Sequence, residues 1–153
     1  IKYNPNLAFV YNNLGSVLRM KHSYEEAITS YNKALSLEKS YLYYNNLGQV
    51  YLEMEKYDFA IRFFSKTIEL YPAFAPAYNN RANAYSKSKS YKLAMWDFNN
   101  ALLIDENYGV AYLNRAITHE KMNNLEAACA DYLRAQELGV GVAESYYKLG
   151  CNE

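Results

Sequence analysis

The sequence predicts an all-α solenoid built from pairs of helices that repeat along the chain. Tyr11, Tyr44, Tyr78, Tyr112 and Tyr146 follow one another at intervals of 33, 34, 34 and 34 residues. A fixed period in this range is typical of helical repeat proteins, in which each repeat buries its apolar face against its neighbours. Hydrophobic residues make up 51% of the 153-residue chain, which is enough for a continuous core.

Each repeat is predicted to contain two antiparallel helices. In the first repeat, the apolar residues from Phe9 to Leu18 follow helical spacing. Ser23 stands three residues before Glu26, which is a capping-box pattern and predicts that a second helix begins near Tyr24. Because the break between the two helices is only two or three residues long, we expect them to pack antiparallel.

Small residues recur at one position of each helix. In the first helix they are Gly15, Gly48, Ala82, Ala116 and Gly150, and in the second helix they are Ala27, Ala60, Ala94 and Ala128. Glycine inside a helix costs roughly 1 kcal/mol relative to alanine. These glycines therefore predict a close approach of the two helix backbones in each pair.

The chain resembles the tetratricopeptide repeat family in its recurring tyrosines, in its small residues and in one aromatic position of the second helices, which holds Tyr31, Phe64, Phe98 and Tyr132. The resemblance spans nearly the whole chain as a single domain: residues 1–7 end a preceding repeat, four repeats follow at 8–40, 41–74, 75–108 and 109–142, and a terminal helix occupies 143–153. It implies a right-handed superhelical solenoid whose first helices line a concave groove. A binding scaffold for proteins or peptides is the function that it implies.

The charge pattern argues against several classes of partner. Lys plus Arg and Asp plus Glu both number 16, so no net field attracts nucleic acid or an anionic membrane. The chain also has no apolar run long enough for a membrane span.

No set of residues in the sequence predicts an enzyme, a metal site or a cofactor. His119 occupies a core position of its repeat, and the Gly139–Gly141 stretch follows a helix and indicates a helix stop, not a phosphate loop. Cys129 and Cys151 match no metal-ligand spacing and no disulfide framework, so we expect packed thiols. Packed thiols favour a reducing intracellular compartment, although the sequence does not identify one.

Two charged positions change together between repeats. Arg81 and Arg115 stand where the first two repeats have leucine, and Asp97 and Asp131 stand 16 residues further on, where those repeats have Ser30 and Phe63. Because the two charges occur as a pair or not at all, we predict an ion pair between the two helices of one repeat. A ligand-binding arginine is the alternative.

Asparagines recur on the face that the resemblance assigns to the groove. The candidate peptide-binding residues are Asn12, Asn13, Asn45, Asn46, Gln49, Asn79, Asn80, Asn83 and Asn114, and the candidate margin residues are Arg19, Glu53, Lys87 and Lys121. The column resembles the asparagine ladder of the O-linked N-acetylglucosamine transferase superhelix, which implies that it holds the main chain of an extended peptide. The alternative is that these amides only bond to neighbouring helices.

Two further hypotheses concern the partner. Tetratricopeptide domains that clamp the acidic tail of chaperones use lysine and arginine, but the matching positions of this chain hold residues such as Asn12, Ser16 and Pro76. The positive charge is missing, which argues against such a clamp. A structural role is the other alternative, in which Tyr146 and Leu149 of the terminal helix stack copies of the chain into homo-oligomers.

Overall fold

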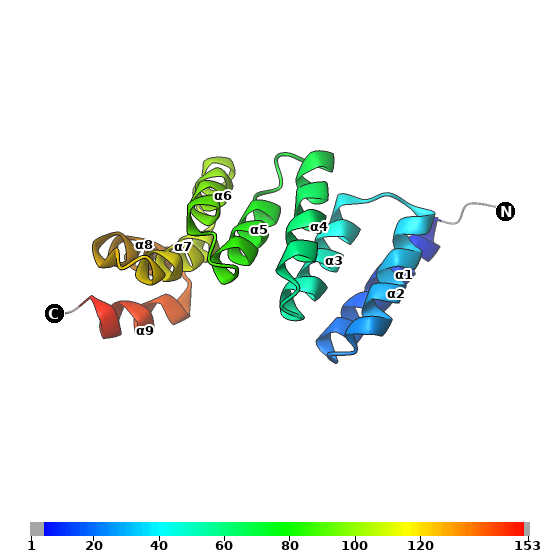
Figure 1. Ribbon diagram of the computed structural model, residues 1–153, viewed down its shortest axis with the longest axis horizontal. Coiled ribbons are helices and arrows are strands. Elements are labelled where there is room, and N and C mark those ends of the chain that lie inside the picture. The colour runs from blue at the N-terminus through cyan, green and yellow to red at the C-terminus, as the bar shows by residue number, and fades with distance from the viewer. Residues whose placement is uncertain (1–4, 152–153) are drawn as a thin grey trace. The chain divides into compact units, whose positions relative to one another are not determined.

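The structure is a computed structural model that describes residues 5–151, and within that range it consists of helices without any strand (Figure 1). The all-α prediction is therefore confirmed for the described residues. The chain divides into two compact units, residues 1–72 and 73–153, which are treated separately below. The first unit contains α1 (Pro5–Met20), α2 (Tyr24–Leu37), α3 (Tyr41–Glu53) and α4 (Tyr57–Leu70). The second contains α5 (Ala75–Lys87), α6 (Tyr91–Ile104), α7 (Gly109–Lys121), α8 (Leu125–Glu137) and α9 (Gly141–Gly150).

The first helix starts earlier than the sequence pattern indicates. Residues 1–7 were expected to end a preceding repeat, but α1 begins at Pro5. Proline is tolerated in the first turn of a helix, where its missing N–H has no partner to lose. Residues 1–4 lie outside the described part of the chain.

The turn inside each repeat has the same backbone geometry. His22, Glu55, Lys89 and Asn123 all have positive φ, between 57° and 65°. The next residue donates its N–H to a carbonyl five residues back; the Ser23 N–H, for example, lies 2.9 Å from the Leu18 oxygen. This closure satisfies the end of the first helix and reverses the chain within three residues.

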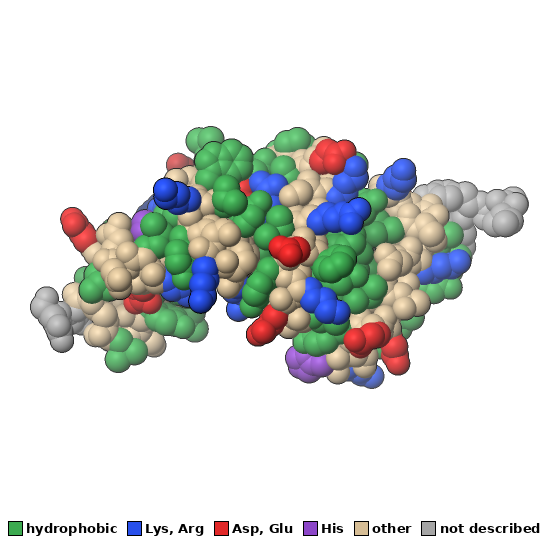
Figure 2. Space-filling model, viewed as in Figure 1, with side chains coloured by type: hydrophobic (Ala, Val, Ile, Leu, Met, Phe, Trp, Pro, Cys, Tyr) green, Lys and Arg blue, Asp and Glu red, His purple; other side chains and the backbone are tan. Residues whose placement is uncertain are grey.

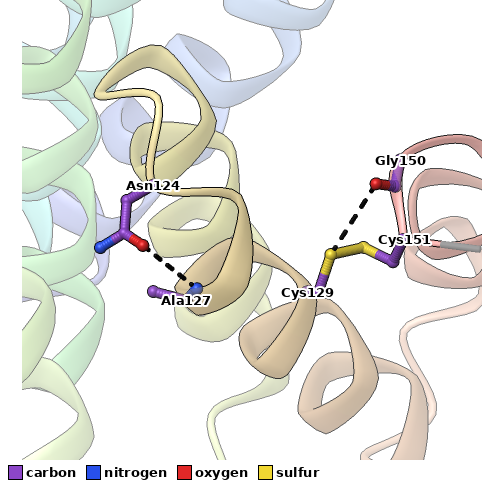
Figure 3. Close-up of a disulfide and its surroundings, with 5 residues drawn as sticks. All are labelled: Asn124, Ala127, Cys129, Gly150 and Cys151. Atoms are coloured by element: carbon purple, nitrogen blue, oxygen red, sulfur yellow. Dashed lines mark hydrogen bonds between the residues drawn. A yellow bond between two sulfur atoms is a disulfide. The ribbon is translucent and has the colours of Figure 1, made fainter. Parts of the chain in front are cut away.

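The capping box predicted at Ser23 was wrong. Ser23 is the residue that precedes α2, but its side chain makes no capping hydrogen bond. The first helical turn is satisfied by the backbone instead, because the Ala27 N–H donates to the Ser23 carbonyl at 3.0 Å. Side-chain capping is seen at Asn124, whose Oδ1 accepts from the Ala127 N–H at 3.3 Å (Figure 3).

The core of each unit is a chain of small and aromatic side chains. In the first unit, Ala27 and Tyr31 of α2 pack with Leu47 and Val50 of α3. In the second unit, Ala116, Ala128 and Tyr132 form the corresponding cluster, and Tyr147 of α9 packs against it. The second helix of one repeat thus packs against the first helix of the next, as a solenoid requires.

The glycines approach aromatic rings, which corrects the expectation that they let two backbones meet. A Cβ atom on Gly15 would lie 2.8 Å from the Tyr31 ring, and a Cβ on Gly48 would lie 2.7 Å from the Phe64 ring. Tyr31 and Phe64 are fully buried. The absence of a Cβ therefore makes room for a large ring of the second helix.

Both predicted ion pairs are confirmed. Arg81 Nε lies 2.7 Å from Asp97 Oδ2, and Arg115 Nε lies 2.7 Å from Asp131 Oδ2. Each pair joins the two helices of one repeat. Burial opposes the charge on Arg81, but its hydrogen bond and attraction to Asp97 outweigh that effect and raise the pKa of the guanidinium.

The prediction of packed thiols was wrong, because Cys129 and Cys151 form a disulfide (Figure 3). The two residues are 22 positions apart, and their Cα atoms lie 5.7 Å from each other. The bond links α8 to the residue that follows α9, because α9 folds back onto α8. This return of the chain is a tertiary feature that the spacing of two cysteines does not reveal. Because the two cysteines are bonded, they no longer support a reducing compartment.

Candidate functional site

The candidate site consists of the asparagines on the first helices of the repeats, which are described for each unit separately. In the first unit α1 contacts α3, and in the second unit α5 contacts α7. These contacts bring asparagines of adjacent repeats within hydrogen-bonding distance.

In the first unit, two asparagines are joined by a bond between their side-chain amides. Asn46 Nδ2 donates to Asn12 Oδ1 at 2.9 Å, and Asn12 Nδ2 donates in turn to Asn13 Oδ1 at 3.4 Å. Asn12 and Asn46 are half-buried, whereas Asn13 is exposed. A chain of three amides therefore runs from α3 across α1.

The second unit has the same arrangement between α5 and α7. Asn114 Nδ2 donates to Asn79 Oδ1 at 3.0 Å, and Asn79 Nδ2 donates to Asn80 Oδ1 at 3.3 Å. Asn79 is only 3% exposed, so this amide belongs as much to the packing between repeats as to the surface. Asn12, Asn46, Asn79 and Asn114 thus each bond to a neighbouring helix, and their peptide-binding role stays a prediction.

Asn46 and Asn114 nevertheless retain hydrogen-bonding capacity. A primary amide has two N–H donors and one carbonyl oxygen. Each of these two residues uses one N–H on the preceding repeat, and its second N–H and its carbonyl oxygen have no partner among residues 5–151. The bond to the preceding repeat also fixes the orientation of the amide, which leaves a donor and an acceptor in set positions.

The sequence analysis did not predict that an asparagine of one repeat bonds to an asparagine of the preceding repeat. The signal was present in the fourth repeat, where Leu113 replaces the acceptor asparagine. In the terminal helix, the position of the donor asparagine holds Lys148. Acceptor and donor are therefore lost together, as with the arginine–aspartate pairs.

Hydroxyl groups continue the polar face beside the asparagines. The hydroxyl oxygens of Ser86 and Thr118 lie 2.9 Å apart and join α5 to α7, and the Thr118 hydroxyl donates to the main-chain carbonyl of Asn114 at 2.9 Å. In the first unit, the Ser16 hydroxyl donates to the main-chain carbonyl of Asn12 at 3.2 Å. These bonds hold the backbone of the asparagine-bearing helices.

The remaining predicted residues are distributed unevenly. Asn45 and Gln49 lie on α3, and Asn80 and Asn83 lie on α5; Gln49, Asn80 and Asn83 are half-buried. At the margin, Arg19 forms an ion pair with Glu53, so these two charges offset each other in the first unit. Lys87 and Lys121 of the second unit are exposed and have no ion-pair partner among the described residues.

The described residues contain neither a metal site nor a membrane-spanning helix. No group of His, Cys, Asp or Glu side chains in residues 5–151 is arranged to hold a metal ion. None of the helices described is both long enough and apolar enough to cross a membrane.

Comparison with protein families accounts for nearly the whole chain. Profiles described as Tetratricopeptide repeat match residues 8–41, 41–74, 75–108 and 110–138. A search of curated proteins gives no match.

Solved structures with this fold are numerous. MamA 41-end from Desulfovibrio magneticus RS-1 has a TM-score of 0.77 at 19% identity, over 92% of this chain and 78% of its own. YrrB, described as a TPR protein with an unusual peptide-binding site, has a TM-score of 0.76 at 22% identity, over 92% and 74%.

A further similar structure is more closely related in sequence. The first TPR of Spaghetti (RPAP3), bound to the HSP90 peptide SRMEEVD, has a TM-score of 0.67 at 30% identity, over 71% of this chain and 87% of its own. The profiles, the helix pairs and these structures agree. The chain therefore belongs to the tetratricopeptide repeat family.

Proposed function

We propose that this protein-interaction scaffold binds an extended peptide or protein segment along the asparagine face of its first helices. The observation that carries the proposal is the unused donor and acceptor on Asn46 and Asn114, each held in place by an amide of the preceding repeat. A peptide group presents one N–H and one C=O, so an oriented asparagine amide can bind it without contacting the ligand's side chain.

Helix geometry determines how such a ligand would meet successive repeats. Packed helices lie about 8–10 Å apart, and an extended peptide advances about 3.3 Å per residue. One asparagine would then meet about every third residue of the ligand. The proposed partner is consequently an extended segment with a weak sequence preference, and its selectivity comes from margin residues such as Lys87 and Lys121.

The similar structures support a peptide ligand as a class. The first TPR of Spaghetti is bound to a peptide, and YrrB is described as having an unusual peptide-binding site. The acidic-tail clamp remains disfavoured, because the positions that match the clamp hold no cation to bind a terminal carboxylate.

The test uses a peptide selected by display on the full chain. Binding should be lost when Asn13, Asn46, Asn80 and Asn114 are all changed to alanine, and it should be retained in Asn32→Ala, an exposed asparagine on α2. N-methylation of every third residue of the peptide should abolish binding, because it removes the main-chain donor. Binding that depends only on the peptide's side chains would contradict the proposal.

Stability has to be measured on the same variants. Each lost amide bond should cost about 0.5–1.5 kcal/mol. Denaturant unfolding of the four-alanine variant therefore separates loss of fold from loss of ligand. Asn46→Ala alone provides a milder version that keeps the core intact.

Self-association through the ends of the chain is a second candidate function, favoured by exposed apolar side chains. On α9, Leu149 is 87% exposed and Tyr146 is 42% exposed; on α1, Phe9 is 58% exposed. Sedimentation velocity over a hundredfold concentration range should show concentration-dependent oligomers that Leu149→Ser weakens. A chain that stays monomeric throughout would exclude this role.

A further inference from the structure

A stack of four aromatic rings runs between α3 and α4. Tyr44 stacks on Phe63 with ring centroids 6.5 Å apart, Phe63 stacks on Tyr51 at 5.2 Å, and Tyr51 stacks on Phe59 at 5.1 Å. The angles between consecutive ring planes are only 23°, 6° and 20°. The rings therefore form a nearly parallel series that ends at Phe59, which is 50% exposed.

A cleft of about 530 Å³ lies over this stack, and Arg62 and Lys66 also line it. That volume falls within the range of about 300–1,000 Å³ that is typical of ligand pockets. Figure 2 shows hydrophobic side chains interspersed with basic and acidic ones over α4. None of the candidate groove asparagines lines the cleft.

The cleft depends on the particular residues of the second repeat. In the third and fourth repeats, an ion-paired arginine lies over the corresponding tyrosine, with Arg81 5.8 Å from the Tyr78 ring and Arg115 5.3 Å from the Tyr112 ring. The second repeat has Leu47 in place of that arginine, and Leu47 is fully buried. Its tyrosine and Phe63 therefore form an apolar wall without an internal cation.

The cations at the rim are not equivalent. Lys66 is held by Glu69 at 2.7 Å, so that pair carries no net charge. Arg62 is exposed and has no hydrogen-bond or ion-pair partner among the described residues. A guanidinium binds a carboxylate through two parallel N–H bonds, which makes an acidic group its best complement.

We propose that this cleft is a second binding site, and that it takes a peptide segment with an aromatic side chain next to an acidic residue. The aromatic ring extends the stack beyond Phe59, and the carboxylate accepts hydrogen bonds from Arg62. Because Phe59 is half exposed at the rim, the site suits a side chain presented by a passing segment better than an enclosed small molecule. It lies apart from the asparagine face and does not depend on it.

The probe is fluorescein-labelled Gly-Asp-Phe-Asp-Gly, titrated with the full chain and followed by fluorescence anisotropy. Two control probes replace Phe with Ala or both Asp residues with Lys. We expect saturable binding of the first probe and at least about tenfold weaker binding of both controls. Equal binding of all three probes, or no saturable binding, would overturn the proposal, as would equally tight binding of free N-acetylphenylalanine.

Variants of the protein test whether the probe binds in the cleft. Phe59→Ser and Arg62→Glu should each weaken binding at least about tenfold, whereas Leu93→Ser should leave it unchanged. Leu93 is the matched control, because it occupies the position of Phe59 in the third repeat and is 51% exposed. We expect the three variants to keep the fold, because Phe59 and Leu93 are at least half exposed and Arg62 is exposed.

A last variant separates this proposal from the proposed function. The double change Asn46→Ala and Asn114→Ala should leave the probe's affinity unchanged, even though it weakens binding to the asparagine face. If it weakens the probe instead, then the probe occupies that face and the cleft proposal is wrong.

Discussion

Arg81 holds Asp97 through two parallel hydrogen bonds. Nε donates to Oδ2 at 2.7 Å, and Nη2 donates to Oδ1 at 2.8 Å. Asp97 has no exposed surface, and the side chain of Arg81 is 14% exposed. The two charges are thus matched in geometry and almost completely removed from water, which is the situation in which losing one partner is most harmful.

Removing one partner of this pair should destabilise the chain strongly. We expect Arg81→Leu or Asp97→Ser to lower the free energy of unfolding by about 3–5 kcal/mol, because each leaves a buried charge without its counterion. The double variant Arg81→Leu with Asp97→Phe copies Leu47 and Phe63 of the second repeat. It should lose less than either single variant in urea unfolding; additive losses would contradict a specific pair.

Filling the glycine position of the second repeat should destabilise that repeat. Helix propensity alone predicts that Gly48→Ala gains about 1 kcal/mol. The new methyl would meet the buried Phe64 ring at 2.7 Å, however, and overpacking costs about 1–3 kcal/mol. We expect a net loss of about 1 kcal/mol in denaturant unfolding, and a more stable variant would show that the ring can move aside.

Opening the disulfide should loosen the terminal helix. A bond that closes a loop of 22 residues stabilises a chain by about 3 kcal/mol through the entropy of the unfolded state. We expect Cys151→Ser to accelerate amide hydrogen exchange in α9 while α5 and α6 stay protected. Cys129→Ser should behave identically, and reduction should have no further effect on either variant.

The stability of the second unit should depend on the charge state of His119. Burial and the nearby Arg115 lower the pKa of this imidazole, and the attraction of Asp131 offsets only part of that effect. The unfolded chain therefore binds a proton at a higher pH than the folded chain does. The contribution of the neutral His119 to stability is therefore fully present above the unfolded pKa of about 6.5 and is lost as the pH falls below it.

His119→Tyr tests this dependence, because Tyr51 and Tyr85 occupy the same position in two other repeats. Between about pH 7.5 and pH 5, the melting temperature of the unmodified chain should fall more than that of the variant. Carboxylates titrate equally in both proteins, so only the difference between the two slopes reports on His119. Parallel slopes would mean that the imidazole titrates normally.

The repeat pattern predicted most of the fold because the repeats of one chain can be compared with one another. The recurrence of Tyr11 and its equivalents indicated the helix pairs, and the joint appearance of Arg81 with Asp97 predicted their contact. Features that occur once could not be found in this way. The Cys129–Cys151 bond is formed by the terminal helix alone, so no second example existed from which to infer it.

The candidate site was only partly predictable for a related reason. The sequence indicated which asparagines share a face, but it did not distinguish an amide committed to packing from one with spare hydrogen bonds. Asn79, at 3% exposure, and Asn114 differ in this respect although both belong to the same face. The aromatic cleft could not be predicted from the sequence, because its lining residues Tyr44, Tyr51 and Phe63 also satisfy the pattern of a buried core.

The two recurring polar contacts also differ in what happens when repeats are duplicated or exchanged. The arginine–aspartate pair has both ends in one repeat, so a copied block carries it intact to any place in an array. The bond from Asn114 to Asn79 joins adjacent repeats, so a transplanted block keeps only half of it. A transplanted block would therefore keep its arginine–aspartate pair but lose its asparagine bond to the repeat that it has left. In the native chain the acceptor position of the fourth repeat holds Leu113, which has no side-chain amide.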